Sequence, residues 1–231
     1  MLICVSAGAQ TYAVHNGDTI NRRDAKGLKQ GTWKRYYEND TLLSERSFKD
    51  GKPVGIFRTY FPSGKLLSQL TFRKNSLASD AVMFHENGNV SARGKYNDQK
   101  KDSTWYYFNE SGKNISIEYY TNGVNDGNWV NYYENGNILR EMGWKNGKKS
   151  GPFKEYFENG KLKFSSNYKN NELDGMTIVY HPEGTVWMQG KYINGFKQGP
   201  WTVYKPDGSK EADEFYKNSE LVPAPNTAGK K

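Results

Sequence analysis

The sequence predicts an all-β fold in which eight stacked β-hairpin repeats of 24 residues form an elongated, twisted antiparallel sheet. Three observations predict it: a pattern that restarts at a constant interval, columns that are aromatic in every copy, and turn residues at fixed places. A fixed period indicates one supersecondary unit stacked on copies of itself. The copies start, without an insertion or deletion between them, at Gly31, Gly55, Ser79, Ser103, Gly127, Gly151, Gly175 and Gly199.

Aromatic side chains mark the repeat most clearly. When each start residue is counted as column zero, columns five and seventeen are aromatic in all eight copies and column two is aromatic in six. We expect these rings to form the core, which accounts for most of the aromatic content without a binding site. Column five comprises Tyr36, Tyr60, Phe84, Phe108, Tyr132, Tyr156, Tyr180 and Tyr204. Column seventeen comprises Phe48, Phe72, Tyr96, Tyr120, Trp144, Tyr168, Tyr192 and Tyr216.

Turn residues fold each repeat into a hairpin. Columns seven to nine read Glu-Asn-Gly in three copies and Pro-x-Gly in three others, which is typical of a short hairpin loop with a bulge. Pairing outward from this loop places column five opposite column eleven and predicts that column seventeen lies on the same apolar face. A second turn, which carries Asn-Gly at Asn122, Asn146 and Asn194, leads into the next hairpin.

The ends of the chain differ from the repeats. Residues 31–222 are predicted to be the repeat domain, residues 10–30 a degenerate capping hairpin, and residues 223–231 a disordered tail. Residues 1–9 resemble the end of a secretory signal, with an Ala-x-Ala pattern before a cleavage site after Ala9. This pattern favours export to the periplasm or the extracellular space, and the cytoplasm is the alternative. Cys4, the only cysteine, would leave with the signal.

Candidate catalytic and metal-binding groups do not assemble into a site in the sequence. His85 and His181 occupy column six four repeats apart, about 40 Å on the strand spacing of a sheet, and are interpreted as surface substitutes for Tyr or Phe. Column seven holds a row of carboxylates that is interpreted as solvated turn residues: Glu38, Glu86, Glu110, Glu134 and Glu158. The sequence therefore predicts a protein that is not an enzyme and holds no cofactor.

Charge is distributed unevenly between the two sets of turns. The chain carries a net charge of +8, and the loops that join successive hairpins contain twelve basic and four acidic residues. A row of cations suits an anionic polymer, a lipid headgroup surface or an acidic protein, and solvated loops that keep the sheet soluble are the alternative. Nucleic acid is disfavoured, because the aromatic residues fall in predicted core columns. The candidate basic rim is Lys100, Lys101, Lys145, Lys148, Lys149, Lys169 and Lys197.

Three segments resemble MORN repeats: YTNGVNDGNW at 120–129, WKNGKKSGPF at 144–153 and YINGFKQGPW at 192–201. The hairpin YYENG at 132–136 is similar to the bacterial variant of the repeat in YwqK-type antitoxins. The resemblance implies the fold, and it implies functions that range from protein assembly to phospholipid binding and toxin neutralisation. Ser79 and Ser103 replace the leading Gly and Ala81 replaces the column-two ring, so less regular stacking is expected near residues 76–103.

Taken together, these patterns favour a non-enzymatic repeat scaffold that mediates protein–protein or cell-envelope interactions. A toxin-neutralising protein of the YwqK type is one alternative, and binding of an anionic lipid or polymer through the basic rim is another. The sequence predicts no transmembrane segment, and it leaves the partner and the oligomeric state open.

Overall fold

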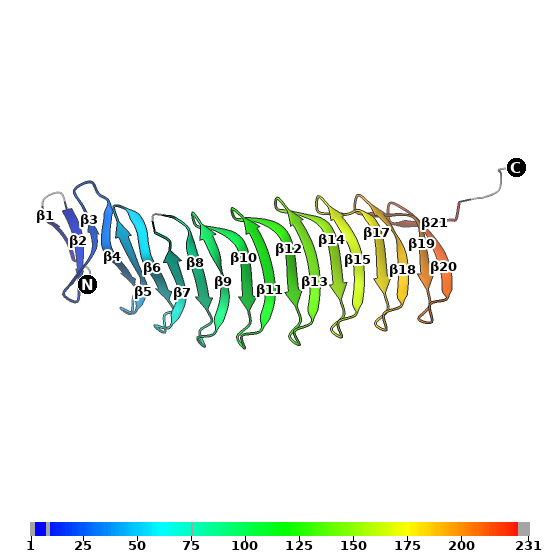
Figure 1. Ribbon diagram of the computed structural model, residues 1–231, viewed down its shortest axis with the longest axis horizontal. Helices are drawn as coiled ribbons and strands as arrows, with labels where there is room; N and C mark the ends of the chain where they lie inside the picture. The colour runs from blue at the N-terminus through cyan, green and yellow to red at the C-terminus, as the bar shows by residue number, and fades with distance from the viewer. Residues whose placement is uncertain (1–2, 8–9, 75, 226–231) are drawn as a thin grey trace. The chain divides into compact units, whose positions relative to one another are not determined.

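The computed structural model describes residues 3–7, 10–74 and 76–225, and in this part of the chain all regular structure is β-strand (Figure 1). The strands follow one another as antiparallel hairpins, so the predicted fold class is confirmed. The chain forms two compact units. The N-terminal unit is Met1–Asn114 with Tyr120–Gly123, and the C-terminal unit is Ile115–Tyr119 with Val124–Lys231.

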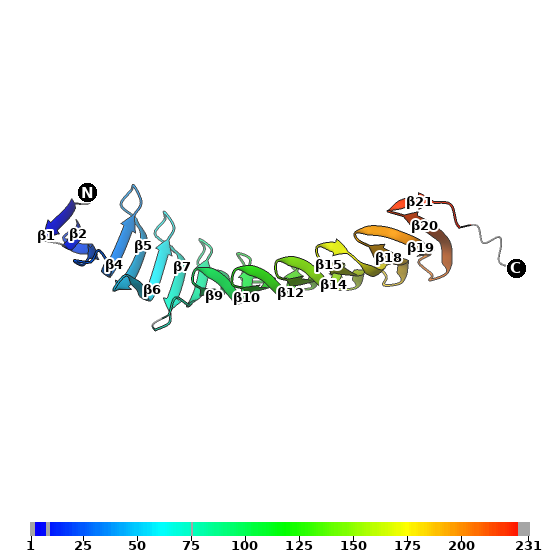
Figure 2. The ribbon, with the colours of Figure 1, turned by 90° about the horizontal axis from the view of Figure 1, so that it is seen from above.

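Within the described residues the N-terminal unit contains ten strands, and the residues of β11 (Asn114–Thr121) are divided between the two units. Consecutive strands of this unit pair with one another (Figure 2). Its strands are β1 (Ile3–Ala7), β2 (Gln10–His15), β3 (Asp18–Arg23), β4 (Lys29–Tyr36), β5 (Leu42–Lys49), β6 (Lys52–Tyr60), β7 (Leu66–Phe72), β8 (Ser79–Phe84), β9 (Val90–Asn97) and β10 (Lys100–Phe108).

The C-terminal unit continues the same hairpin pattern. Its strands are β12 (Val124–Tyr132), β13 (Ile138–Lys145), β14 (Lys148–Tyr156), β15 (Leu162–Lys169), β16 (Glu172–Leu173), β17 (Gly175–Tyr180), β18 (Val186–Ile193), β19 (Phe196–Tyr204), β20 (Lys210–Lys217) and β21 (Glu220–Val222). In the described part of the chain, no helix is long and apolar enough to cross a membrane.

The hairpin of β12 and β13 shows how the turn residues set the register. Tyr132 lies opposite Ile138, which confirms the predicted pairing of columns five and eleven. The register shifts by one residue just before Tyr132, as in a β-bulge. Gly136 has a φ of 90°, and its amide donates a 3.0 Å hydrogen bond to the carbonyl of Tyr133. Only glycine adopts this conformation without strain, which explains the recurrent glycine of the turn.

A row of side chains from columns two and fifteen forms the core of the C-terminal unit. In this row Trp129 pairs with Met142, and Met142 pairs in turn with Phe153. Phe153 is 8% exposed and its ring lies 5.4 Å from that of Tyr168, so columns two and seventeen share a face. The row continues through Ser166, Thr177, Gly190 and Trp201, which are buried, and ends at the half-buried Glu214.

Column five lies on the other face, which corrects the prediction that columns five and seventeen share one. Side chains alternate along a strand, so Trp129 and Tyr132, three residues apart, point to opposite sides of the sheet. All members of column five are half-buried. The hydroxyl of Tyr156, for example, donates a 2.8 Å hydrogen bond to the carboxylate of Glu141. Column two, rather than column five, is therefore the most buried aromatic column.

Repeat three is more regular than its sequence suggests. Strand β8, which contains Ala81, pairs without a shift along β7, and it pairs with β9 in the register of the other hairpins. Ala81 lies opposite Gly94, and the indole of Trp105 lies directly on Gly94. The ring that Ala81 lacks is therefore supplied by the next repeat. The register shift between Asp102 and Tyr106 recurs between β5 and β6, between β13 and β14 and between β18 and β19, so it belongs to the repeat, and β7–β8 differs in pairing without it.

The same cluster recurs in the C-terminal unit. Gly190 and Trp201 stand 96 residues after Gly94 and Trp105, and the indole of Trp201 covers Gly190 in the same way. Trp105 is 0% exposed and Trp201 is 1% exposed. The chain thus repeats at an interval of four hairpins as well as at an interval of one hairpin.

The N-terminal hairpin of β2 and β3 packs against the first repeat. Strands β2 and β3 bury Ala13, His15 and Ile20, and the ring of His15 stacks on Tyr36 at 3.8 Å. Strand β1 pairs with β2. The cleavage site expected after Ala9 and residues 226–231 of the expected disordered tail lie outside the described residues.

Candidate functional site

The predicted basic rim divides into exposed lysines and lysines that cover aromatic rings. Lys100, Lys145, Lys148 and Lys169 are exposed and form no ion pair within the described residues. They lie at the strand ends that flank the second turn of the repeat. Lys145 and Lys148 lie directly opposite each other across the Asn146–Gly147 turn, so two like charges face each other there.

The other three rim lysines occupy column twenty-two and fold back onto the aromatic face. The ammonium group of Lys101 lies 5.0 Å from the ring centroid of Trp105, and that of Lys197 lies 4.4 Å from that of Trp201. The ammonium group of Lys149 lies 5.1 Å from the ring centroid of Tyr168. Burial lowers the pKa of Lys197, against an opposing effect of Glu214. These three lysines therefore pack on rings of the aromatic columns.

The histidines and acidic turns are separate from this surface. Nε2 of His85 lies 2.9 Å from the carbonyl oxygen of Phe108. Tyr133, which occupies the same column in another repeat, donates a hydrogen bond from its hydroxyl to the carbonyl of Tyr156. His181 makes the equivalent contact with the carbonyl of Tyr204. Both histidines therefore take the place of a Tyr whose side chain contacts the backbone of the next repeat. The described residues include no group of three or more His, Cys, Asp and Glu that could hold a metal ion. The column-seven carboxylates Glu38, Glu86, Glu110, Glu134 and Glu158 are exposed.

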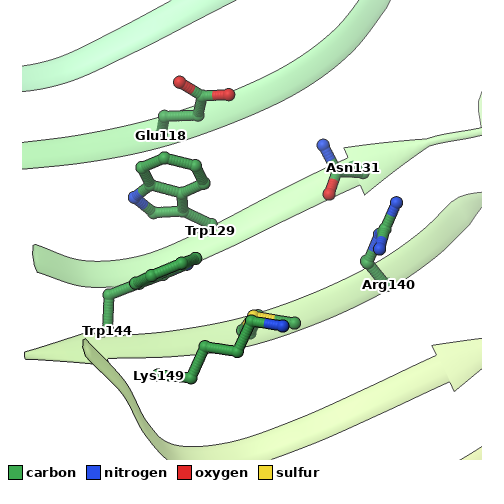
Figure 3. A pocket seen from close by; sticks show the side chains of 7 residues that line it. Glu118, Trp129, Asn131, Arg140, Trp144 and Lys149 are labelled. Carbon is green, nitrogen blue, oxygen red and sulfur yellow. The ribbon is translucent and has the colours of Figure 1, made fainter. Parts of the chain in front are cut away.

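A pocket of about 190 Å³ opens on the aromatic face of the C-terminal unit (Figure 3). The indoles of Trp129 and Trp144 form one wall, with ring centroids 5.1 Å apart and planes tilted by 42°. Met142, from the strand that pairs with β12, adds a thioether. The polar residues that line the pocket are Glu118, Asn131, Arg140 and Lys149.

The charges of the pocket are separated in space. Figure 3 shows Glu118 on the side of Trp129, and Arg140 with Asn131 on the other side. The carboxylate of Glu118 accepts a 3.2 Å hydrogen bond from the hydroxyl of Ser116. Within the residues that the structure describes, neither Arg140 nor Lys149 forms an ion pair. Within the described residues the pocket therefore offers an apolar wall beside two cations that form no ion pair, although Glu155 lies opposite Arg140 on the neighbouring strand.

The sequence did contain a signal for this pocket, although it was missed. Arg140 is the only charged residue in column thirteen, whose other members are small or apolar. Trp144 is the only Trp in column seventeen. Such departures from the repeat consensus are visible without a structure, but only the pairing of β12, β13 and β14 brings them together. Of the predicted site residues, only Lys149 and the core residue Trp144 line the pocket.

A second hollow, of about 260 Å³, lies in the N-terminal unit beside Arg73, Tyr96 and Asp102. Arg73 pairs there with Asp80 at 3.3 Å, so its charge is already compensated. The pocket at Arg140 is the stronger candidate.

Comparison with protein families supports the repeat assignment. The model described as MORN repeat variant matches residues 29–50, 53–74, 125–146 and 149–170. The second pair of segments follows the first pair by 96 residues, the interval that separates the two glycine–tryptophan clusters. None of the curated proteins compared matches the chain.

Similar solved structures add little. A mutant of TarM from S. aureus in complex with Fondaparinux, alpha-GlcNAc-glycerol and UDP is 17% identical, with a TM-score of 0.24, and the match covers 61% of this chain and 22% of that one. The TcdB2-TccC3-Cdc42 structure is 12% identical, with a TM-score of 0.20, and the match covers 85% of this chain and 12% of that one. The chain thus spans less than a quarter of either structure. The four matched segments show that the chain contains repeats of the MORN variant type, and the other hairpins have the same strand–turn–strand build.

Proposed function

We propose that the chain is a non-enzymatic scaffold that binds an anionic region of another protein or of a cell-envelope surface. A MORN repeat array supports a role in interactions. The observation that carries the proposal is the cross-strand pair of Lys145 and Lys148, which are exposed and have no ion-pair partner within the described residues.

Like charges directly opposite each other destabilise a strand pair, by up to about 1 kcal/mol. The turn between Lys145 and Lys148 is formed by Asn146 and Gly147, which have φ values of 50° and 78° and need no lysine beside them. Lys49 and Lys52 repeat the arrangement in the N-terminal unit. An acidic partner would remove this repulsion on binding, so the arrangement favours recognition of a negatively charged surface.

The decisive experiment compares two variants that have the same net charge. A rim variant replaces Lys100, Lys145, Lys148 and Lys169 by Gln. A control variant replaces four exposed lysines that lie elsewhere and have no side-chain hydrogen bond or ion pair within the described residues: Lys95, Lys154, Lys191 and Lys205. The immobilised chains are incubated with an extract of the native host at about 50 mM and about 300 mM salt.

We expect the wild-type chain and the control to retain the same partner, and the rim variant to lose it. Retention should fall with salt, since exposed charges are screened within ~10 Å at 0.1 M. Equal loss in both variants would show that net charge, rather than the rim, controls binding. If no partner is retained over a blank support, the scaffold function itself is overturned. Vesicles with and without anionic lipid, tested with the same variants, separate an envelope surface from a protein.

The resemblance of the YYENG hairpin at 132–136 to YwqK-type antitoxins supplies a narrower form of the proposal, in which the partner is a toxin. Export after cleavage at Ala9 would argue against that form, because the toxin would then meet its target in another compartment. Mass spectrometry of the N-terminus of the native protein shows whether the chain is cleaved after Ala9, and so distinguishes the exported form from the toxin-binding form.

A further inference from the structure

We propose that the pocket at Trp129, Arg140 and Trp144 anchors the partner of the scaffold by taking one apolar side chain, while an adjacent Asp or Glu of the same partner binds Arg140 and Lys149. This inference rests on the proposed scaffold function and specifies the chemistry of the segment that is bound. It concerns the C-terminal unit only, since all the residues that line the pocket belong to that unit.

The size of the pocket fits a single side chain. Its volume of about 190 Å³ equals that of roughly six water molecules at ~30 Å³ each. Sites for small-molecule ligands and cofactors usually enclose about 300–1,000 Å³, so this pocket is too small for that class. Insertion of one side chain from a partner into a hollow is instead the usual form of an interface hot spot.

The apolar wall is available to such a side chain. Trp129 and Trp144 are each half-buried, whereas Trp105, Phe153 and Trp201 in column two are buried. Their tilted indoles and the thioether of Met142 present aromatic and polarisable surface to a ligand. Tryptophan, methionine and arginine are the residue types that are enriched in the centres of protein interfaces.

The cationic side of the pocket specifies a carboxylate beside that side chain. Arg140 is exposed, and its guanidinium group lies on the side of the pocket away from Glu118 (Figure 3). A guanidinium group binds a carboxylate through two parallel hydrogen bonds, which gives geometric specificity. Lys149 lines the same pocket, and its cation–π contact with Tyr168 orders the ammonium group without neutralising it. A carboxylate bound at Arg140 would also avoid repulsion by Glu118.

Packing alone gives no reason for a charge at position 140. Ser44, Ser68 and Ser116 occupy the same column in other hairpins, where a small side chain suffices. Arg140 lies opposite Asn131 on β12 and opposite Glu155 on β14. Glu155 pairs with Lys163 at 2.8 Å, and within the described residues it forms no ion pair with Arg140. The arginine therefore belongs to a function of this one repeat rather than to the repeat architecture.

The test uses two acetylated and amidated dipeptides, Phe-Glu and Phe-Gln, which differ only in the charge of the second side chain. Each is titrated into the full chain labelled with ¹⁵N, and the indole N–H signals of the six tryptophans are followed. We expect Phe-Glu to shift the signals of Trp129 and Trp144 with a Kd on the order of 1 mM, and Phe-Gln to bind at least about tenfold more weakly. The variant Arg140→Gln should bind Phe-Glu as weakly as wild type binds Phe-Gln.

The matched control is Arg93→Gln, which removes an exposed arginine from the N-terminal unit and should leave the titration unchanged. Equal affinities for the two dipeptides, an unaffected Arg140→Gln variant, or the absence of shifts at Trp129 and Trp144 would each overturn the proposal. These failures are distinct from failure of the scaffold function. The scaffold function is tested by whether the exposed turn lysines retain a partner, and none of these lysines lines the pocket.

Discussion

Single glycines determine how closely the core rings approach the sheet. At Gly190 an added Cβ atom would lie 2.3–2.4 Å from three atoms of the Trp201 indole, far inside van der Waals contact. The glycine is therefore required by the ring that covers it, not by its backbone conformation. The sheet accommodates a full indole with 1% exposure because no side chain separates the ring from the backbone.

We accordingly expect Gly190→Ala to lower the free energy of unfolding by about 1–3 kcal/mol through overpacking. Trp201→Val should cost about 3–5 kcal/mol by itself, as other losses of buried rings do. The double variant should cost less than the sum, since the smaller residue leaves room for the new methyl group. Urea denaturation measures all three values. Strict additivity would show that the indole and the glycine are not in contact in solution.

Two tyrosines with raised pKa values make stability depend on alkaline pH. Burial and a hydrogen bond to Glu141 raise the pKa of Tyr156 to about 12, and a hydrogen bond to Glu214 together with burial raises that of Tyr216 to about 12. Both phenols keep their protons in the folded chain, whereas in the unfolded chain they lose them near pH ~10. Their contribution to stability is therefore present below pH ~10 and is lost as the pH rises towards about 12.

The measurement is the free energy of unfolding at several pH values between ~9 and ~12. We expect a decline that becomes shallower in Tyr156→Phe and in Tyr216→Phe, because phenylalanine has no proton to lose. Absorbance at alkaline pH should show two fewer late-titrating phenols in the double variant. A decline of unchanged steepness in both variants would contradict the assignment.

At the scale of the hairpin, the column that a turn lysine occupies determines whether its side chain packs on aromatic rings or is exposed. Lys197, in column twenty-two, lies over Trp201 and Tyr216, with its ammonium group 4.4 and 4.6 Å from the two ring centroids. Lys145, in column eighteen, is exposed at the end of β13. The two residues contribute equally to the net charge but differently to the fold.

Replacement of Lys197 by Gln should therefore cost about 1 kcal/mol of unfolding free energy through the lost cation–π contacts. Replacement of Lys145 by Gln should change it by less than about 0.5 kcal/mol. Lys197→Arg, which keeps the cation, is the control and should lie between the wild type and Lys197→Gln. If the two glutamine variants are equally stable, the contacts over the rings contribute nothing measurable.

The hairpin also shows what could be predicted from the sequence and what could not. The turn residues around Gly136 and Gly147 predict both turns and the pairing of Tyr132 with Ile138, because their chemistry is local. The face assignment failed at the bulge beside Tyr132. One extra residue between columns eleven and thirteen reverses the alternation of side chains, so column seventeen faces away from column five. The pocket at Arg140 depends on pairings among three strands, which no local signal specifies.

On the scale of the whole chain, two blocks of four repeats have the same build, but their glycine–tryptophan clusters differ in hydrogen bonding. In both blocks an indole covers a glycine and is covered by a lysine, as seen at Trp105 with Lys101 and at Trp201 with Lys197. The family match repeats at the same interval, at residues 29–50 and 125–146. The difference is that the indole N–H of Trp105 donates a 3.1 Å hydrogen bond to the carbonyl of Lys95. Within the described residues the buried indole N–H of Trp201 has no partner.

This difference predicts unequal effects of the same substitution. Trp105→Phe and Trp201→Phe remove the same indole portion from equally buried sites, so the loss of apolar burial should be similar. Trp105→Phe also breaks a hydrogen bond, which costs about 1 kcal/mol more, whereas Trp201→Phe removes a buried donor that has no partner within the described residues. We therefore expect Trp105→Phe to be the more destabilising variant by about 1–2 kcal/mol. Hydrogen exchange of the backbone amides in β10 and β19 measures the two losses separately, and equal losses, or a larger one at Trp201, would refute the assigned hydrogen bonding.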